Sequence, residues 1–315
     1  MDSPTDSPSV VLSFDVEEHD RIEAAAGLDC PPSVRLEYAD RMERTTRRLL
    51  DMLEEVGAKA TFFILGEIAR TRPRLVRDIA DAGHEVASHG WDHQRVHMLS
   101  PQGFLDDVRV SKDALEQASG GPVLGYRAPT FSVGRRTGWA IDVLAEAGYQ
   151  YDSSVFPVRH DRYGVPDAPR TPFVVEGESA HMIELPPATY HTLGQNLPVA
   201  GGGYFRLFPL SWMESGLRQL AQSDPAVGVL YFHPWEFDPD QPRLPLGWLA
   251  KWRTYVGVGR SSARLGRLLA NHTGRFRRAA DVACDLRRRI ASLPRYRLAP
   301  ASVPVLSVEC GPVTP

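Results

Sequence analysis

The 315-residue sequence has few cysteines, no long apolar run and no surplus of basic residues. Its three cysteines are odd in number and widely spaced, which argues against a disulfide framework or a cysteine-based zinc site. No apolar run approaches the roughly 20 residues that a membrane-spanning helix needs. The formal net charge of −3 argues against a nucleic-acid-binding protein, which would normally carry a basic excess.

The N-terminal stretch also lacks the features of a secretory signal. Residues 1–8 are acidic and interrupted by proline, without a basic segment or an apolar core. Together with the scarcity of cysteine, this composition predicts a soluble protein that works in the cytoplasm. The hydrophobic content of 43% is ordinary for a globular protein of this size.

Short apolar runs alternate with amphipathic stretches along the first half of the chain. Strands are expected near residues 10–14, 60–65, 84–88, 123–126, 149–152 and 227–232. Helices are expected near residues 38–56, 73–82, 100–119, 137–147 and 210–222. This alternation predicts an α/β fold with a parallel sheet or barrel. In such folds the chemistry lies where the strands end and the loops begin.

Composition divides the chain into successive segments. We expect a disordered leader at 1–8, a barrel at 9–245 with a proline-rich, decorated section at 165–240, an arginine-rich helical extension at 246–293 and a flexible tail at 294–315. The arginines of the extension are expected to form a solvated helical face. Peripheral contact with an anionic membrane surface is the alternative.

Two histidines four residues apart, His89 and His93, follow one of the expected strands. An acidic cluster, Asp15, Glu17 and Glu18, lies at the end of another strand about seventy residues upstream. Two histidines and one carboxylate form the ligand set of a catalytic zinc ion with an open position. Because a strand alternates its faces, Asp15 and Glu17 should point to one side, so that one could bind the ion while the other acts as a base. The alternative is that both segments are ordinary polar loops whose side chains bind no metal ion.

Three further polar residues, Arg127, Asp152 and His233, also follow expected strands. An arginine beside paired carboxylates keeps one of them ionised and oriented, although Arg127 could also be an ordinary surface residue. A histidine at the tip of a buried strand can protonate a leaving group, especially if Asp152 fixes its tautomer. The alternatives are a turn or cap for Asp152 and a half-buried histidine packed on Trp235.

Three residues are candidates for contacts with a substrate, namely Pro129, Tyr204 and Trp235. Apolar sugar faces pack on aromatic rings, so the aromatic cluster around Trp235 could form a sugar-stacking platform or simply belong to the core. Tyr204 follows a run of glycines, Gly201–Gly203, that could let the backbone approach a ligand closely. Pro129 lies two residues after Arg127.

Five short motifs, in order along the chain, resemble those of the polysaccharide deacetylase family, also called the NodB-homology family or carbohydrate esterase family four. The motifs are Ser13–Glu17, Ser88–His93, Tyr126–Pro129, Tyr151–Ser153 and Phe232–His233. The resemblance covers roughly residues 9–240 and implies a distorted (β/α) barrel. Three stretches look more narrowly like the exosortase-associated deacetylases of bacterial exopolysaccharide gene clusters: Tyr151–His160, Asn196–Arg206 and His233–Arg243.

The resemblance also implies roles for the polar residues at the strand ends. Asp15 would be the catalytic base, and Arg127 would orient it. His233 would be the general acid, and Asp152 would tune it.

For the metal site, the resemblance implies that Glu17, His89 and His93 hold a divalent ion, expected to be Zn²⁺. The ion would polarise the acetamide carbonyl and help to hold the oxyanion. The first motif departs from the common family pattern, in which two aspartates are adjacent and the second is the ligand. Here Val16 occupies that place, so the ligand moves to Glu17, with Glu18 as the alternative.

The predicted function is the metal-dependent removal of N-acetyl groups from hexosamine units of an exopolysaccharide or of its lipid-linked precursor. Its partner would be an N-acetylated glycan, and not a nucleic acid. Relatives with a similar first motif include enzymes that act on cyclic amides such as allantoin, some without a bound metal, which is the first alternative. The second, a non-catalytic glycan-binding module, is disfavoured because every proposed catalytic position holds a competent side chain.

Overall fold

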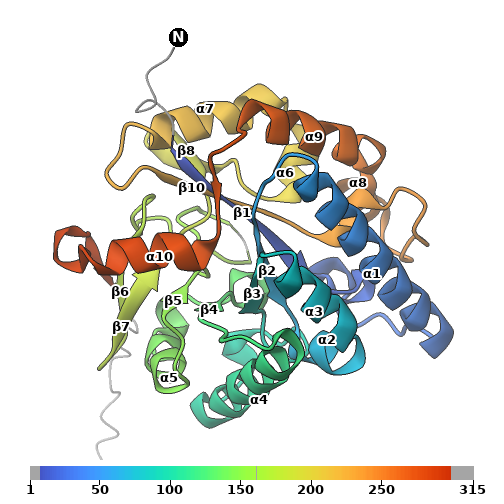
Figure 1. The fold of residues 1–315 in the computed structure, drawn as a ribbon, viewed down its shortest axis with the longest axis horizontal. Coiled ribbons are helices and arrows are strands. Elements are labelled where there is room, and N and C mark those ends of the chain that lie inside the picture. The colour runs from blue at the N-terminus through green and yellow to red at the C-terminus, as the bar shows by residue number, and fades with distance from the viewer. Residues whose placement is uncertain (1–7, 161, 299–315) are drawn as a thin grey trace, which may run out of the picture.

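The computed structural model describes residues 8–160 and 162–298, which form a curled sheet surrounded by helices (Figure 1). The strands are β1 (Ser9–Val16), β2 (Thr61–Ile64), β3 (Glu85–Ser88), β4 (Gly125–Tyr126), β5 (Tyr151–Asp152), β6 (Phe173–Glu176), β7 (His181–Glu184), β8 (Thr189–Thr192), β9 (Gln195–Pro198), β10 (Val227–Phe232), β11 (Phe276–Arg277) and β12 (Arg295–Arg297). The α-helices are α1 (Pro32–Glu54), α2 (Gly66–Thr71), α3 (Pro73–Asp81), α4 (Pro101–Ser119), α5 (Ala140–Glu146), α6 (Gly202–Leu207), α7 (Leu210–Leu220), α8 (Trp248–Tyr255), α9 (Ser261–Asn271) and α10 (Ala279–Arg287). The expected leader, up to residue 7, and the expected tail from residue 299 lie outside the described residues.

The main sheet follows the order β10-β1-β2-β3-β4-β5-β7-β6-β12. Neighbouring strands are parallel, except for the antiparallel pair β6 and β7. Just after β7 the chain reaches β10, where Pro187 forms a parallel bridge with Val229 and the backbone N–H of Ala188 donates to the Val229 carbonyl at 2.9 Å. This contact joins the two ends of the series of strands from β10 to β7. The predicted distorted (β/α) barrel is therefore confirmed.

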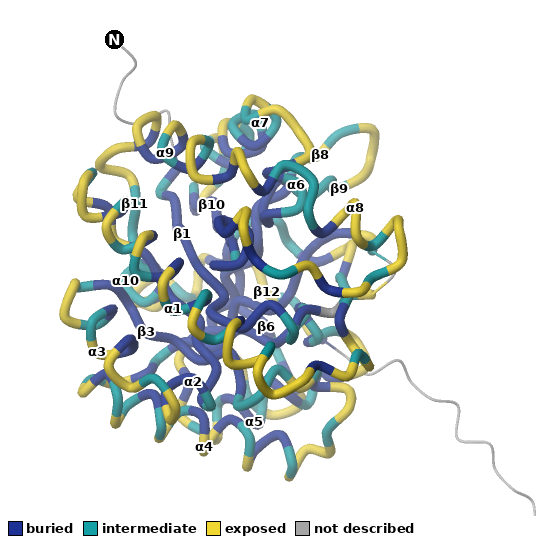
Figure 2. The backbone as a smooth tube through the Cα atoms, turned by 90° about the vertical axis from the view of Figure 1, so that its right-hand side faces the viewer, coloured by how far each residue is buried: buried dark blue, intermediate teal, exposed yellow. Residues whose placement is uncertain are grey.

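Strand β1 shows how the sequence positions side chains in this barrel. Alternate residues from Val10 to Val16 belong to the outer core, between the sheet and the helices. The residues between them face the barrel interior, where Val11 belongs to the inner core and Ser13, Asp15 and Glu17 follow on the same side. Figure 2 shows the central strands buried along their length. The prediction that Asp15 and Glu17 share one face therefore agrees with the structure.

The longer helices of the structure agree with the helices that the sequence pattern predicts. Helix α4 begins as predicted, with the Ser100 hydroxyl accepting a hydrogen bond from the Gly103 N–H at 3.1 Å. Helix α1 begins at Pro32, six residues ahead of the expected start, because the fixed φ of proline suits the first helical turn. The six-residue helix α2 is too short to show a helical period and was not predicted.

The decorated section at 165–240 joins the same sheet. Strands β6 and β7 pair with each other, and β7 also pairs with β5. Strands β8 and β9 form a separate two-stranded sheet. Helices α6 and α7 then lead to β10, which lies beside β1 (Figure 1).

The C-terminal segment 246–293 is helical as predicted, with α8, α9 and α10, and it also contributes to the barrel. Strand β11 pairs with β1, and β12 pairs with β6, although β12 falls in the segment that was expected to be a flexible tail. Both strands have at most three residues, which is too short for an alternating pattern to show in the sequence.

Helix α10 covers the end of the barrel at which the strands begin. Its residues Val282 and Leu286 belong to the inner core, together with Val11 of β1. Its first backbone N–H groups donate to the Thr61 hydroxyl and to the Glu85 carboxylate, each at 2.8 Å, at the starts of β2 and β3. These contacts leave the opposite end of the barrel open for a site.

Some arginines of the C-terminal segment form ion pairs with neighbouring aspartates. Arg277 pairs with Asp285 at 2.6 Å, and Arg278 pairs with Asp281 at 2.8 Å. This pairing agrees with the expected solvated face. Among the described residues, no helix is both long and apolar enough to cross a bilayer.

His84 was predicted to be structural, and the structure gives its role. Its Nδ1 accepts a hydrogen bond from the Ala60 N–H at 3.1 Å. Burial, followed by the charges of Lys59 and Arg278, lowers the pKa of His84 from 6.5 to about 4. Between these pH values the unfolded chain binds a proton that the folded chain excludes, so the free energy of unfolding falls as the pH falls from 6.5 to 4.

We therefore expect His84→Asn, which keeps an acceptor near the same place but does not titrate, to flatten the pH dependence of stability. The wild type should lose up to about 3 kcal/mol more than the variant between pH 6.5 and pH 4. Urea unfolding at several pH values measures this difference. Parallel curves for the two proteins would contradict the expectation.

Candidate active site

The predicted site residues meet at the open end of the barrel. Because the strands β10, β1, β2, β3, β4 and β5 run parallel in adjacent positions, their carboxyl ends lie along one rim. Asp15 and Glu17 come from the end of β1, and His89, Arg127 and His233 directly follow β3, β4 and β10.

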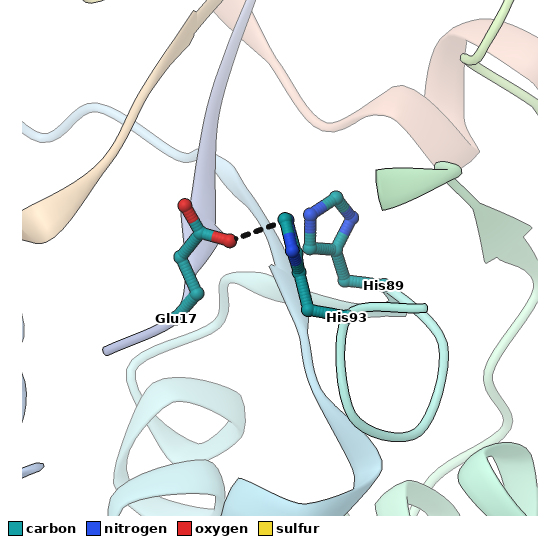
Figure 3. A group of neighbouring side chains, drawn as sticks. All are labelled: Glu17, His89 and His93. Atoms are coloured by element: carbon teal, nitrogen blue, oxygen red, sulfur yellow. Dashed lines mark ion pairs between the residues drawn. The ribbon is translucent and has the colours of Figure 1, made fainter. Parts of the chain in front are cut away.

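Glu17, His89 and His93 form a compact group of possible metal ligands (Figure 3). One ligand atom from each residue lies within 4.8 Å of the others. Glu17 Oε2 and His93 Nε2 are 2.6 Å apart, and the two imidazole rings have their centroids 5.3 Å apart. His93 has a φ of 70°, a left-handed backbone that turns its ring back toward His89.

The orientation of His89 leaves one nitrogen free for a ligand. Its Nδ1 lies 2.9 Å from the backbone carbonyl of Arg127, which can only accept, so Nδ1 carries the proton and donates. The lone pair therefore lies on Nε2. A backbone carbonyl that holds a metal-ligating histidine in this way is a common feature of metal sites.

The charge states of the group also suit a cation. Burial alone would raise the pKa of Glu17, but His93, His233 and His89 outweigh it and lower the pKa to about 2. Burial lowers the pKa of His89 to about 4. Glu17 is thus ionised and His89 is neutral at pH 7, which are the forms that bind metals. Oε2 of Glu17 is buried and makes no well-formed hydrogen bond, so a divalent ion fits the donor set.

The alternative ligand Glu18 is used elsewhere. Its carboxylate binds Arg21 at 2.7 Å, which also binds Glu67. His19, next in the chain, lies with Nε2 at 2.9 Å from the Tyr255 hydroxyl. The structure therefore favours Glu17 as the carboxylate of the group.

Arg127 is fully buried, so the alternative of an ordinary surface arginine is wrong. Its Nη1 donates to Asp15 Oδ1 at 2.6 Å and to the Ser13 hydroxyl at 2.8 Å. Its Nε and Nη2 donate to the carbonyl and the hydroxyl of Ser153, and its guanidinium lies 4.0 Å from the ring centroid of Phe63. All of these contacts hold Asp15 in one orientation, beside the possible metal ligands.

His233 approaches the same carboxylates from the other side. Its Nε2 lies 3.7 Å from Glu17 Oε1 and 4.0 Å from Asp15 Oδ2, and its side chain is 20% exposed. Burial by itself would lower the pKa of His233, but Glu236, Glu17 and Asp15 raise it to about 9. The imidazole can therefore carry a proton at neutral pH, as a general acid must.

The carboxylate that supports His233 is Glu236, and the prediction of Asp152 for this place is wrong. Glu236 Oε2 lies 3.5 Å from His233 Nδ1 and accepts a hydrogen bond from the His233 N–H at 3.0 Å. The buried Arg206 lies 3.3 Å from the other oxygen of Glu236. Glu236 lies in the short 3-10 turn Pro234–Phe237, and its spacing of three residues from His233 is the signal that could have indicated it.

Asp152 instead faces Glu184 across the neighbouring strands β5 and β7. Both side chains are completely buried, and burial raises the pKa of each. Asp152 also accepts from the Ser154 hydroxyl, and Glu184 accepts from the Val155 N–H at 3.0 Å. Two adjacent buried carboxyl groups cannot both ionise at low cost, so the pair holds a proton at neutral pH.

The three residues predicted to contact a substrate have different surroundings. Trp235 is only 8% exposed, with its ring stacked on His233 at 5.6 Å and the Arg206 guanidinium at 5.2 Å. It therefore packs against His233 as part of the core, and its prediction as a sugar platform is wrong. Pro129 is buried, and Tyr204 of α6 stacks on Phe208. Their contact with a substrate stays a prediction.

A cleft of about 350 Å³ lies beside His93, which forms part of its wall. Its walls include Arg21, Asp92, Arg95 and Thr130. These four side chains can form hydrogen bonds with a hydrated ligand such as a sugar.

Comparison with known families separates the chain into two matched parts. Residues 2–151 match the model of the polysaccharide deacetylase family. The first half of the chain is a polysaccharide deacetylase domain. Residues 153–283 match a domain of unknown function, DUF3473. The deacetylase domain supplies Asp15, Glu17, His89, His93 and Arg127, and the second part supplies His233.

Curated relatives of the deacetylase domain match over short stretches. The peptidoglycan deacetylase-like protein FGM2 of Gibberella zeae is 34% identical over 110 residues, which cover 34% of this chain and 32% of that protein. A peptidoglycan-N-acetylglucosamine deacetylase of Bacillus cereus is 31% identical over 75 residues, which cover 24% of this chain and 27% of that protein. The chain thus spans about a third or less of the length of these relatives.

Solved structures match nearly the whole chain and support the barrel fold. A Mycobacterium smegmatis protein assigned to the polysaccharide deacetylases has a TM-score of 0.62 at 21% identity, over 94% of this chain and 96% of that one. The PuuE allantoinase has a TM-score of 0.61 at 14% identity, over 91% and 92%. At such low identities, these likenesses show only that the chain has the same fold as the two proteins.

We expect the purified protein to bind roughly one divalent ion per chain, as a site with three protein ligands would. His89→Ala or Glu17→Gln should abolish most of this binding, because each removes one of the three ligands. His181→Ala, which removes an exposed histidine from β7, should have no effect. Elemental analysis of the purified proteins measures the ion content. An unchanged ion content in the His89 and Glu17 variants would exclude this site.

The buried pair of Asp152 and Glu184 makes a second prediction. The pKa of Glu184 is raised by burial, so the folded state keeps a proton that the unfolded chain releases above its ordinary pKa of 4.5. The free energy of unfolding contributed by the pair therefore falls as the pH rises. Glu184→Gln keeps the acceptor for Val155 and removes this loss, so its stability relative to the wild type should increase from pH 5 to pH 8.

Denaturant unfolding at pH 5, 6.5 and 8 measures this trend. Glu178→Gln, an exposed position in the turn between β6 and β7, is the matched control and should show none. A difference between Glu184→Gln and the wild type that shrinks toward pH 8 would refute a shared proton.

Proposed function

We propose that this chain is a metal-dependent hydrolase that removes N-acetyl groups from hexosamine units of an exopolysaccharide or of its lipid-linked precursor. One observation carries the proposal: the group of Glu17, His89 and His93 lies between an arginine-bound Asp15 and a carboxylate-bound His233. This arrangement supports a Lewis acid, a base and an acid that act together on one substrate. The deacetylase domain in the first half of the chain supports the choice of reaction.

Zinc is the ion that we propose for the site. Two imidazole nitrogens and one carboxylate oxygen leave a fourth position open, which is typical of catalytic zinc. When bound, such an ion lowers the pKa of a water molecule and polarises the carbonyl of the acetamide.

Asp15 is the base in this proposal. Arg127 and Ser153 hold it through a chain of buried hydrogen bonds, and Oδ1 of Asp15 is occupied by Arg127. Oδ2 faces the site, 4.0 Å from His233 Nε2. It can take a proton from the attacking water as the C–O bond to the acetyl carbon forms.

His233 is the acid in this proposal. Its Nε2 faces the site, while Glu236 and Arg206 stabilise the ring from behind. When the C–N bond of the amide breaks, the amine needs a proton, and Nε2 can supply it. The products are acetate and a free amino group on the sugar.

The choice of glycan follows from two resemblances. The relative in Bacillus cereus is described as acting on N-acetylglucosamine of peptidoglycan, which supports a hexosamine substrate. The motifs in the second half of the chain resemble exopolysaccharide-associated deacetylases, which favours an exopolysaccharide. The cytoplasmic location and peripheral contact with a membrane stay predictions.

Hydrolysis of a small cyclic amide is the second candidate, because the PuuE allantoinase has the same fold with a nearly equal TM-score. The possible metal ligands favour the metal-dependent reaction. Allantoin in the same assay separates the two: turnover of allantoin that survives chelation would favour the second candidate.

We expect the wild type to release acetate from N-acetylglucosamine oligomers, and chelation to abolish the release. Asp15→Asn keeps the shape of the side chain but cannot take a proton, so kcat should fall by at least about a hundredfold. Asp240→Asn, at an exposed position, is the matched control and should keep full activity. Acetate release can be followed by a coupled assay. The proposal fails if no N-acetylated glycan is hydrolysed, or if Asp15→Asn is as active as the control.

A further inference from the structure

A second cavity, of about 670 Å³, lies directly beside the candidate active site. Thr130 lines the cleft that contains His93, and the next residue, Phe131, lines this second cavity. The Val96 N–H also donates to the Ser132 hydroxyl at 3.0 Å, which ties the loop after His93 to the wall of the cavity. One extended ligand can therefore reach both places.

Basic residues dominate the polar lining of this cavity. Arg135, Arg136, Arg162 and His97 line it, and among the described residues no aspartate or glutamate does. Arg135 pairs with Asp167. No ion pair joins Arg136 or Arg162 to another described residue, and both side chains are exposed, so their donors are available to a ligand. We call this cavity the arginine pocket.

The wall of the arginine pocket is held in one conformation. Thr130 and Phe131 have φ values of 55° and 49°, which are unfavourable for residues other than glycine and persist only where the surroundings enforce them. The Phe131 ring packs on Tyr231 with a centroid distance of 4.7 Å. The Thr137 hydroxyl accepts from the Gly134 N–H at 2.9 Å and so fixes the turn that carries Arg135 and Arg136.

We propose that the arginine pocket binds an anionic group of the glycan, a carboxylate or a phosphate, while the acetamide to be hydrolysed lies at Glu17, His89 and His93. The proposal rests on the proposed function. Guanidinium groups bind both kinds of anion through paired hydrogen bonds. The anion can come from a uronic acid in the polysaccharide or from the diphosphate of a lipid-linked precursor. The pocket thus makes the enzyme selective for charged glycans.

Three substrates test this selectivity: a neutral N-acetylglucosamine oligomer, the same oligomer with a diphosphate at its reducing end, and an oligomer that contains a uronic acid. The wild type should have a lower KM for at least one charged substrate than for the neutral one, and added salt should reduce the difference. The charged substrate that gains identifies the source of the anion.

The variant Arg136→Gln/Arg162→Gln should raise the KM for the preferred charged substrate about tenfold, as the loss of roughly 1.4 kcal/mol of binding would. Its kcat, and its KM for the neutral oligomer, should stay unchanged. Lys251→Gln/Arg253→Gln, which removes two exposed charges from α8, is the matched control and should behave as the wild type. Equal KM values for charged and neutral substrates in the wild type, or an equal effect of the variant on both, would overturn the proposal.

A binding measurement separates this proposal from the proposed function. Inorganic pyrophosphate and glucuronate are titrated calorimetrically into Asp15→Asn protein, with and without the two arginine substitutions. Binding that is lost with the arginines supports the pocket even if no substrate releases acetate, in which case only the hydrolase proposal fails. If acetate is released but neither anion binds, the pocket proposal fails and the hydrolase proposal stands.

Discussion

The buried ion pair between Arg127 and Asp15 is the interaction on which the site depends. The guanidinium is completely excluded from solvent, and its hydrogen-bond partners come from two other strands: Ser13 and Asp15 on β1, and Ser153 just after β5. One side chain therefore ties together strands that are not neighbours in the sheet. Breaking such a pair leaves a buried charge without compensation, which typically costs about 3–5 kcal/mol. The pair of Arg127 and Asp15 thus both orients the proposed base and holds these strands together.

The sequence predicts this part of the site well because the pattern is local. Alternation along β1 places Asp15 and Glu17 on one face, and the ends of parallel strands bring His89, Arg127 and His233 to the same rim. The partner of His233 could not be found in this way. Asp152 lies at the end of β5 as expected, but its neighbour is fixed by its register with β7, and that strand places Glu184 opposite it. Which carboxylate reaches His233 is decided by the short turn after β10.

For the fold as well, local patterns could be predicted from the sequence and long-range contacts could not. Long elements with a clear period, such as α4 and β10, were predicted close to their true bounds, since many residues contribute to each pattern. Strands β11 and β12 have two and three residues, and each is defined by its pairing: β11 pairs with Val10 and Val11 of β1, ahead of the part of β1 that pairs with β2, and β12 pairs with β6. Composition alone suggested a basic extension and a tail there. Tertiary contacts decided the structure of this segment, including the position of α10 under the barrel.

Strand β5 lies where the two matched families meet, since one match ends at residue 151 and the other begins at residue 153. This strand pairs with β4 on one side and β7 on the other, so the sheet passes through the border without interruption. The border in sequence is therefore not a border in structure. The half that matches a domain of unknown function supplies the strands that complete the barrel, and it also supplies His233. Each hydrophobic cluster among the described residues contains side chains from both halves, so the two halves share one interior.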